Sequence, residues 1–508
     1  MISIENIGQI APIRHSIDLL KRCAGDISRS ALSGGFPLEK DLAYLYDPPA
    51  KFEILLTTCS ALFLFLITSC TGISSFSTLL VLSSLTHYVM TLSDKEITGV
   101  LLGALSLAAW KVSNIAAEHR KTEAEALKSQ PAQRSTEKLP RFFGRYITSY
   151  GNAKLGKPIS SVICSEEEIR AMVNTFRYIV CSLVCISIFT CDFNIYPRYK
   201  MKCKEFGLSL MDFGVTAFMF NAGIICARSH KFRAQKTLYL LALGFIRLAV
   251  LSSGYHSEPS EYGTHLNFYF VYVGSEILSV FLRGCRSWAV LLCCFSLHEM
   301  IITQKDVVRY VMRSERGGFF SANREGLLSL LPYVGVLFLG KYVGELLFKE
   351  KETRKEKGAK LLGVSLGLFA VHEFCGTYSL PSRRLCNLSF TSFSCGAILL
   401  PMSLAFFLSS GLDVTALGKM GQMSKMMGPI FLWSNILVFA GNLLFDWRAF
   451  GRASSHLINL AYLMAVFILP YLLISRPGMD RWLNKPSNTR EKQNSRNLSA
   501  ADRSQKMK

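Results

Sequence analysis

Long apolar runs alternate with short polar segments along most of the chain. The runs are about 17 to 23 residues long, which is the length that crosses a bilayer core of roughly 30 Å as a helix. We expect thirteen membrane spans, near 54–72, 74–93, 98–117, 172–190, 208–227, 237–253, 264–282, 287–304, 326–348, 360–377, 391–410, 427–446 and 456–475. Two of these runs carry a charge, Lys111 in 98–117 and Arg247 in 237–253. Twelve or fourteen spans would each reverse the side of the C-terminus.

Composition supports a membrane protein. Of the 508 residues, 50% are apolar and only 18% are charged, which is too little polar surface for a soluble protein of this size. The sequence therefore predicts an all-α polytopic membrane protein with about 13 transmembrane helices in one bundle. We expect a membrane domain over 54–475, preceded by a polar segment 1–53 and followed by a flexible basic tail 476–508.

Basic residues set the expected orientation, because cytoplasmic loops are enriched in Lys and Arg. The loops 118–171, 228–236 and 349–360 and the tail are basic, so we expect them in the cytosol, with 1–53 and 191–207 in the lumen. The net charge of +21 then reflects topology and attraction to anionic lipid, and excludes a nucleic-acid partner. Segment 305–325 is basic yet expected in the lumen, which favours either an anionic head-group site or a shallow re-entrant segment.

The segment Cys191–Gly207 places an acid, several basic residues and a proline between two apolar runs. Charges at the mouth of two membrane helices are costly, so we expect this segment to bind or transform a substrate. Asp212 and Asn435 lie within apolar runs, where polar groups face a cavity or a partner helix.

Four motifs occur in order between about 172 and 450. They are D-F-x-I-Y-P-R-x-x-x-K…E-x-G-x-S-L-M-D from Asp192, E-Y-G-x-H-x-N-F from Glu261, N-R-E-G from Asn323 and S-R-R-L-x-N-L from Ser382. This set resembles the GPI inositol acyltransferase family. The resemblance implies transfer of a fatty acyl group, such as palmitoyl, from acyl-CoA to the inositol ring of glucosaminyl-phosphatidylinositol. That reaction is an early step of GPI-anchor biosynthesis in the endoplasmic reticulum membrane, with membrane lipids as partners and no cofactor beyond the co-substrate acyl-CoA.

The resemblance implies that Asp192 and Lys202 are the catalytic pair, since the family carries an Asp and a Lys ten residues apart at these positions. Acyl transfer to a hydroxyl requires a group that removes the hydroxyl proton and a positive charge near the developing oxyanion. From the residues alone, a helix-capping Asp192 and a snorkelling Lys202 fit the pattern as well.

The motif around Glu261 suggests recognition of the sugar head group. Glu261 could pair with the glucosamine ammonium, while His265 or Asn267 could hydrogen-bond to inositol hydroxyls. The Trp of the family motif is Leu266 here, and a polar network that ties two helices together is the alternative.

Arginine suits a phosphodiester because its planar fork donates two parallel hydrogen bonds. Interface anchoring is the alternative role. The candidates are Arg198, Arg324, Arg383 and Arg384. Asp212 and Asn435 complete the expected substrate-binding set. The sequon at Asn387 is expected to be unmodified.

Other classes of site find less support. The chain has no C-x-x-C and no H-E-x-x-H, so we predict no metal site. Cys191 and Cys203 could form a disulfide in an oxidising compartment or remain free thiols. His298 is typical of a packing histidine, although an intramembrane His also occurs in membrane-bound O-acyltransferases. A multi-span transporter of an anionic or glycolipid solute is the alternative function, but no repeat of the kind transporters show is evident.

Overall fold

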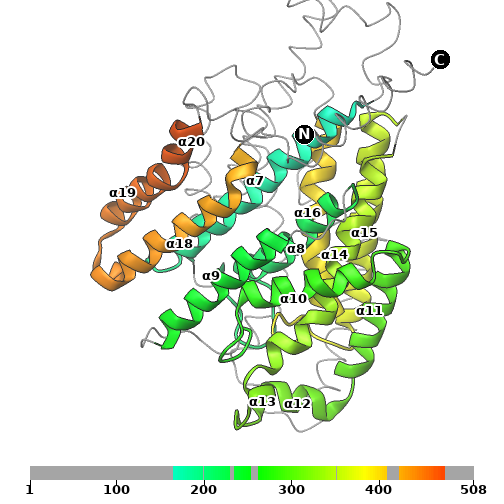
Figure 1. Cartoon of the computed structure of the whole chain (residues 1–508), viewed down its shortest axis with the longest axis horizontal. Helices are drawn as coiled ribbons and strands as arrows, with labels where there is room; N and C mark the ends of the chain where they lie inside the picture. The colour runs from blue at the N-terminus through cyan, green and yellow to red at the C-terminus, as the bar shows by residue number, and fades with distance from the viewer. Residues whose placement is uncertain are drawn as a thin grey trace, which may run out of the picture. The chain divides into compact units, whose positions relative to one another are not determined.

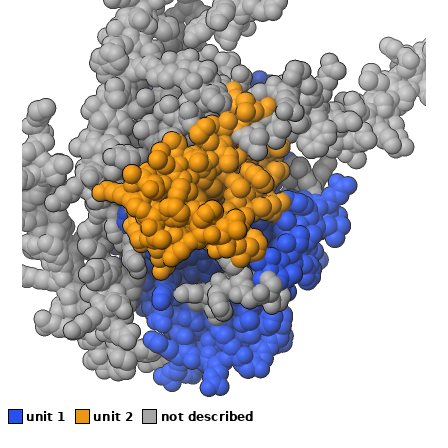
Figure 2. All heavy atoms as spheres, turned by 90° about the vertical axis from the view of Figure 1, so that its left-hand side faces the viewer, with its two compact units in different colours: residues 1–63, 91–169, 197–412 blue, residues 64–90, 170–196, 413–508 orange. Residues whose placement is uncertain are grey.

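The computed structural model describes residues 164–197, 200–228, 234–252, 261–349, 352–408 and 423–474. These residues form helices joined by turns, with no β-strand among them. The chain divides into two compact units (Figure 2): unit 1 includes Pro197–Leu412, and unit 2 includes Arg170–Tyr196 and Asp413–Lys508. The expected spans at 54–72, 74–93 and 98–117, the segments 1–53 and 476–508, and most of loop 118–171 lie outside the described residues.

Unit 1 is built around one central helix, α14 (Arg324–Leu347), which packs against α8, α10 and α11. Helix α15 packs along α16 (Figure 1). A short 3₁₀ turn, η4 (Leu210–Phe213), leads into α8. The remaining helices of the unit are α8 (Gly214–Cys226), α9 (Ala234–Ser252), α10 (Phe268–Phe281), α11 (Ser287–Ile302), α12 (Lys305–Arg313), α13 (Phe319–Ala322), α15 (Arg354–Gly376) and α16 (Leu388–Leu408).

The prediction of about thirteen membrane helices in one bundle is not confirmed. Each of the ten expected spans on described residues contains a helix, but only 6 helices there are long and apolar enough to cross a membrane, or up to 7 if bent pairs count. Helix α10 shows why: its 14 residues reach about 21 Å, less than the roughly 30 Å of a bilayer core. It starts late because Asn267 caps it, accepting hydrogen bonds from the backbone N–H groups of Tyr269 and Phe270.

The basic segment 305–325 is largely helical. Helix α12 bends by 82° from α11, which is the geometry of a broken span or of a re-entrant loop. Its apolar residues Val311 and Met312 are buried against Leu385. The segment is therefore held to the protein by α12 rather than extending freely from it.

Helices α8 and α14 cross at a distance that only glycine allows. A Cβ atom added to Gly340 would lie 2.1 Å from the carbonyl oxygen of Phe220, and one added to Gly223 would lie 2.0 Å from that of Leu337. Gly344 follows Gly340 by four residues and lies against Ile224 in the same way. This is the small-residue packing by which membrane helices approach closely.

Unit 2 combines α7 (Glu166–Thr190), from Arg170 onward, with α18 (Met427–Leu444), α19 (Arg452–Leu463) and α20 (Leu469–Ile474). A π-helical turn, η9 (Met464–Ile468), connects α19 to α20. The rings of Phe189 and Tyr462 stack at 4.0 Å, and the Tyr462 hydroxyl donates to the Cys185 carbonyl at 3.0 Å. Thr190 donates to Asn459 at 3.0 Å. These contacts fix the C-terminal end of α7, immediately before Asp192.

The α8–α14 crossing gives a first prediction. We expect Gly340→Ala to lower the free energy of unfolding by about 1–3 kcal/mol or more, because the added methyl group overlaps a backbone oxygen. Gly367→Ala in α15 is the matched control, since a Cβ there meets nothing within 4 Å. Thermal unfolding of the purified protein in detergent is the measurement, and equal midpoints for the two variants would contradict the prediction.

Candidate functional site

Asp192 lies in unit 2, just after α7, and is held by Asn442. The Asn442 amide nitrogen donates to Asp192 Oδ2 at 3.0 Å, while Asn442 Oδ1 accepts a hydrogen bond from the Trp447 indole at 2.5 Å. Partial burial raises the pKa of the Asp192 carboxyl, and the hydrogen bonds from Asn442 and Cys191 oppose that rise. The carboxylate is thus oriented and has a greater proton affinity than a solvated aspartate.

An aromatic cluster forms around Phe193, the residue that follows Asp192. Phe193 is buried, and its ring lies 5.2 Å from that of Phe189 and 5.1 Å from that of Trp447. Asn194 donates to the carbonyl oxygen of Arg448 at 2.9 Å. These contacts hold the turn at 191–196 against the loop after α18, so that the position of Asp192 is set by packing and hydrogen bonds on both sides.

Lys202 lies in unit 1, where its ammonium pairs with the Glu261 carboxylate. Burial by itself would raise the pKa of the Glu261 carboxyl, but the charges of Lys202 and Arg383 outweigh it and lower that pKa to about 2. Glu261 is therefore a permanent anion near neutral pH. Because Asp192 and Lys202 belong to different units, their action as a pair stays a prediction.

Asp212 is another carboxylate of unit 1 among the predicted site residues, and it is 1% exposed. Its Oδ2 accepts hydrogen bonds from the backbone N–H of Cys203 at 3.2 Å and from the Ser209 hydroxyl at 2.8 Å. Its Oδ1 forms an ion pair with Arg383 Nε at 2.8 Å. The charges of Asp212 and Glu261 raise the pKa of the Arg383 guanidinium against the effect of burial. Lys202, Glu261, Asp212 and Arg383 thus form one cluster of compensating charges.

The motifs that begin at Glu261 and Asn323 interlock. Asn323 Oδ1 accepts from the backbone N–H of His265 at 2.8 Å, and the Gly326 N–H donates to the Tyr262 carbonyl at 3.0 Å. Gly263 has a φ of +108°, a conformation that favours glycine, and a Cβ there would lie 2.4 Å from the Asn323 Cα. A Cβ on Gly326 would likewise lie 2.5 Å from the Tyr262 carbonyl oxygen, so close backbone contact between the motifs requires glycine at both positions.

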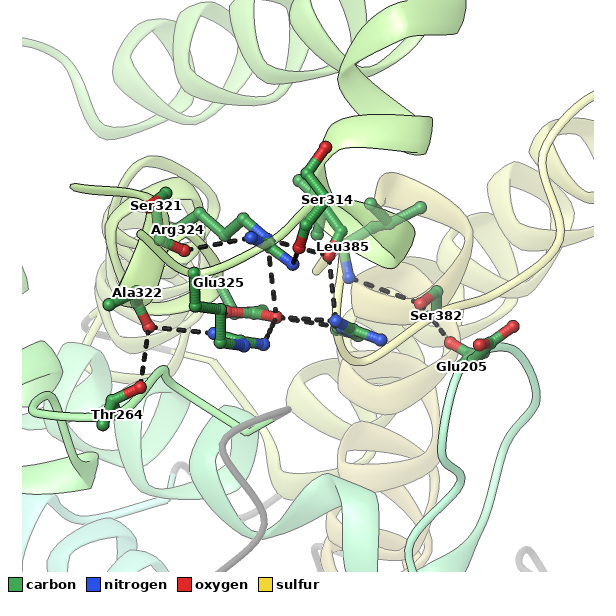
Figure 3. Close-up of polar contacts among 12 residues, drawn as sticks. Glu205, Thr264, Ser314, Ser321, Ala322, Arg324, Glu325, Ser382 and Leu385 are labelled. Carbon is green, nitrogen blue, oxygen red and sulfur yellow. Dashed lines mark hydrogen bonds and ion pairs between the residues drawn. The ribbon is translucent and has the colours of Figure 1, made fainter. Parts of the chain in front are cut away.

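A buried carboxylate, Glu325, joins three segments of unit 1. The Arg316 guanidinium donates to both of its oxygens, at 2.5 and 3.0 Å, and Arg384 donates to Oε1 from Nε at 3.0 Å and from Nη2 at 2.8 Å. Figure 3 shows these contacts converging on Glu325. The side chain of Glu325 is 0% exposed. The paired charges fasten the loop after α12 and the loop before α16 to the first turn of α14.

Arg324 has a different role from its neighbour Glu325. Its guanidinium donates to four backbone carbonyl oxygens, those of Val311, Ser314, Glu315 and Ser321, at 2.7–3.2 Å. It therefore closes the C-terminal end of α12 and the turn that follows (Figure 3). Arg324 uses all three of its guanidinium nitrogens on the protein, and Arg384 uses Nε and Nη2. Arg383 has terminal nitrogens that hydrogen-bond to no group in the described part of the chain.

The remaining predicted site residues have local partners. The Asn267 amide donates to the Gly244 carbonyl at 2.9 Å and its oxygen caps α10, while Asn435 donates to Phe431 one turn earlier in α18. His265 is exposed and accepts at Nδ1 from Asn323 at 3.1 Å, which leaves its Nε2 edge for other contacts. Arg198 lies outside the described residues.

Four further observations concern residues named in the sequence analysis. His298 is buried, with Nε2 2.9 Å from the Leu385 carbonyl oxygen, as a packing histidine would be. Asn387 is fully buried and its amide nitrogen donates to Ser379 and Leu380, in agreement with an unmodified sequon. Cys191 and Cys203 are free thiols. Within the described ranges, no three His, Cys, Asp or Glu side chains gather as metal ligands would.

Sequence reasoning missed Glu325 and Arg316. Glu325 lies inside the N-R-E-G motif, next to Arg324, whose guanidinium suits phosphate and was the predicted site residue. An acid in the first turn of a long apolar helix was the available signal, since such a charge needs a cationic partner when buried. The partner itself comes from a loop and has no periodic pattern that would reveal it.

Apolar helices long enough to cross a bilayer, with buried ion pairs in the loops between them, define a multi-pass membrane protein with a charged site at helix ends. The sequence profile of the GWT1 family matches residues 50–473, so the chain belongs to the GWT1 family.

Individual relatives agree with this assignment. An uncharacterized protein of Arabidopsis thaliana is 30% identical over 318 residues, which are 58% of this chain and 72% of that protein. The human glucosaminyl-phosphatidylinositol-acyltransferase PIGW is 29% identical over 257 residues, 45% of this chain and 51% of that protein. The GPI-anchored wall transfer protein 1 of Schizosaccharomyces pombe is 26% identical over 315 residues, 56% of this chain and 67% of that protein. The match thus spans about half the length of the human relative.

The Glu325 contacts give a second prediction. Glu325→Gln leaves the buried Arg384 and the half-buried Arg316 without their counter-charge, and we expect a loss of about 3–5 kcal/mol in the free energy of unfolding. The measurement is the thermal midpoint in detergent. Glu315→Gln is the control, because that side chain is exposed. A Glu325→Gln midpoint equal to that of the control would show that the pairs contribute little.

Proposed function

We propose that the protein is an acyltransferase of GPI-anchor biosynthesis, which moves a fatty acyl group from acyl-CoA to an inositol hydroxyl of glucosaminyl-phosphatidylinositol. Membership of the GWT1 family and the name of the human relative support this class of reaction. The observation that carries the proposal is Asp192, a carboxylate at the end of a membrane helix with a raised pKa and a fixed orientation. We further propose palmitoyl as the acyl group and the endoplasmic reticulum membrane as the location.

In this mechanism Asp192 is the general base. It takes the proton of the inositol hydroxyl while the oxygen attacks the thioester carbonyl carbon, and a new C–O bond forms. Lys202 stabilises the negative charge that develops on the carbonyl oxygen. The C–S bond then breaks, and the proton held by Asp192 passes to the departing CoA thiolate. Atoms and charges balance, and Asp192 returns to its starting state.

Recognition of the glycolipid is assigned to the charge cluster of unit 1. Arg383 is the candidate for the phosphodiester, because neither of its terminal nitrogens has a protein acceptor among the described residues, whereas Nη2 of Arg384 donates to Glu325 and Val311. Glu261 is a permanent anion that can attract the glucosamine ammonium, and the exposed His265 ring can donate to a hydroxyl. Asn267 and Asn435 have helix-capping and helix-internal partners, so we give them secondary roles at most.

The direct test is an assay with labelled acyl-CoA and glucosaminyl-phosphatidylinositol in membranes that contain the protein. We expect a product that carries the labelled acyl group on its inositol. The label should therefore stay with the inositol lipid when the glucosamine is cleaved off. Transfer of the glycolipid to the lumenal side of the membrane without acylation would instead support the transporter alternative.

A third prediction separates a base from a structural group. Asp192→Asn keeps the shape and the contact with Asn442 but removes proton-accepting power, so turnover should fall by about 100-fold or more at unchanged protein abundance. The control is Asp446→Asn, because asparagine replaces aspartate as a cap at small cost. Near-normal turnover of Asp192→Asn would leave this carboxylate with a structural role only.

A fourth prediction distinguishes the two adjacent arginines. Lysine keeps the positive charge but loses the planar fork, so Arg383→Lys should raise the apparent KM for the glycolipid by about tenfold, equivalent to one charge-assisted hydrogen bond. The KM for acyl-CoA should not change.

Arg384→Lys serves as the matched comparison, because it weakens the contact with Glu325 and should lower thermal stability more than it changes either KM. Kinetics at varied glycolipid concentration decide the matter. Equal effects of the two substitutions on KM would overturn the distinction.

A further inference from the structure

The cation proposed to stabilise the oxyanion, Lys202, needs a fixed position, and its partly exposed ion pair with Glu261 supplies only part of that constraint. The side chains of Lys202 and Glu261 are 41% and 21% exposed. Exposed ion pairs of this kind contribute about 0–1 kcal/mol, because solvent screens them and ordering a long side chain costs entropy. A constraint on the backbone of Lys202 would add to that of the ion pair.

That constraint is visible at the next residue. The backbone N–H of Cys203 donates to Asp212 Oδ2 at 3.2 Å, and the same oxygen accepts from the Ser209 hydroxyl at 2.8 Å. Asp212 thus holds both ends of the loop 203–209. One carboxylate oxygen closes this loop, and Lys202 lies immediately before the closure.

Two further contacts fix the middle of the same loop. The Gly207 N–H donates to the Pro381 carbonyl at 2.7 Å, at a glycine with φ of 125°, and the Ser382 hydroxyl donates to the Glu205 carbonyl. Pro381 and Ser382 belong to the loop before α16, which also carries Arg383. Asp212 and Arg383 therefore join the two loops by charge, and the backbone contacts join them by hydrogen bonds.

Charge compensation explains why a carboxylate can occupy this buried position. An uncompensated buried carboxylate costs several kcal/mol, and Arg383 Nε at 2.8 Å from Asp212 Oδ1 offsets that cost. With one oxygen paired to Arg383, the other oxygen stays oriented toward Cys203 and Ser209. The ion pair and the two hydrogen bonds thus use different oxygens of the same carboxylate.

We propose that Asp212 is a positioning residue, which fixes loop 203–209 through Cys203 and Ser209 and thereby places the ammonium of Lys202. This assigns Asp212 a role through Lys202 rather than contact with the substrate. The kinetic part of the proposal rests on the proposed function, but the position of the loop does not.

Cys203 provides a reporter that is independent of activity. Burial raises the pKa of its thiol, and the Asp212 charge raises it further, so we expect slow reaction with a maleimide in the wild-type protein. Asp212→Asn removes the charge and loosens the loop, and labelling of Cys203 should become about tenfold faster, because the rate follows thiolate fraction and access. The measurement is mass spectrometry of the modified peptides after timed labelling of the full chain in native membranes.

Kinetics supply the second readout. At saturating concentrations of both substrates, Asp212→Asn should lower kcat by about tenfold, because a displaced Lys202 stabilises the oxyanion less well. The control is Asp306→Asn, the same substitution at an exposed carboxylate of α12, which should change neither labelling nor kcat. If Asp212 instead contacted the substrate, the loss of turnover would disappear at saturating glycolipid, and that result would overturn the proposal.

Cys395 distinguishes local from global change, because it is fully buried in α16 of the same unit. Cys395 should remain unlabelled in Asp212→Asn. If it becomes labelled, the variant has unfolded and Ser209→Ala decides, since that change removes one hydrogen bond and keeps the ion pair. Faster labelling of Cys203 in Ser209→Ala, with Cys395 protected, supports the proposal, and unchanged labelling overturns it. Failure of the proposed function would appear separately, as absence of acylated product in the wild-type protein.

Discussion

The arrangement of unit 1 depends on the burial of one carboxylate, that of Glu325, between two guanidinium groups. Removing such a group from water costs several kcal/mol unless its charge is compensated and its oxygens are hydrogen-bonded. Arg316 and Arg384 supply both, and they come from loops about 9 residues before and 59 residues after Glu325. The chain must therefore bring the loop after α12 and the loop before α16 to the start of α14. This requirement gives the N-R-E-G and S-R-R-L motifs a structural reason that is independent of any substrate.

The same contacts separate two kinds of arginine that look alike in sequence. Arg324 closes a helix end with four backbone acceptors, and Arg384 is held by Glu325 and Val311. Arg383, next to Arg384, instead pairs with Asp212 and retains terminal nitrogens without an acceptor among the described residues. Because Arg384 is held by Glu325, the backbone next to it is fixed, and the guanidinium of Arg383 is presented at a defined position. The division follows from hydrogen-bond geometry, which composition and motif spacing do not contain.

The sequence predicted where helices lie better than how many cross a membrane. The length and apolarity of a run are local properties, so all ten expected spans on described residues contain a helix. Span length depends on caps and breaks, such as Asn267 at the start of α10 and the 82° bend between α11 and α12, which are decided by contacts outside the run. In the candidate site, the Lys202, Glu261, Asp212 and Arg383 cluster joins residues from three separate motifs. Single motifs could mark these residues as important but could not show that Asp212 binds the backbone beside Lys202.

The two proposed catalytic groups are held by different physical means, and each means suits its task. A general base works best when its proton affinity is raised while its orientation is kept, and Asp192 has partial burial for the first and the Asn442 amide for the second. A cation that stabilises an oxyanion must keep its charge and its place. For Lys202, the anionic Glu261 favours the charge, and the Asp212 contact with Cys203 fixes the backbone. Partial burial thus raises the proton affinity of Asp192. Lys202 stays partly exposed and keeps its full charge, while the buried Asp212 fixes the backbone beside it.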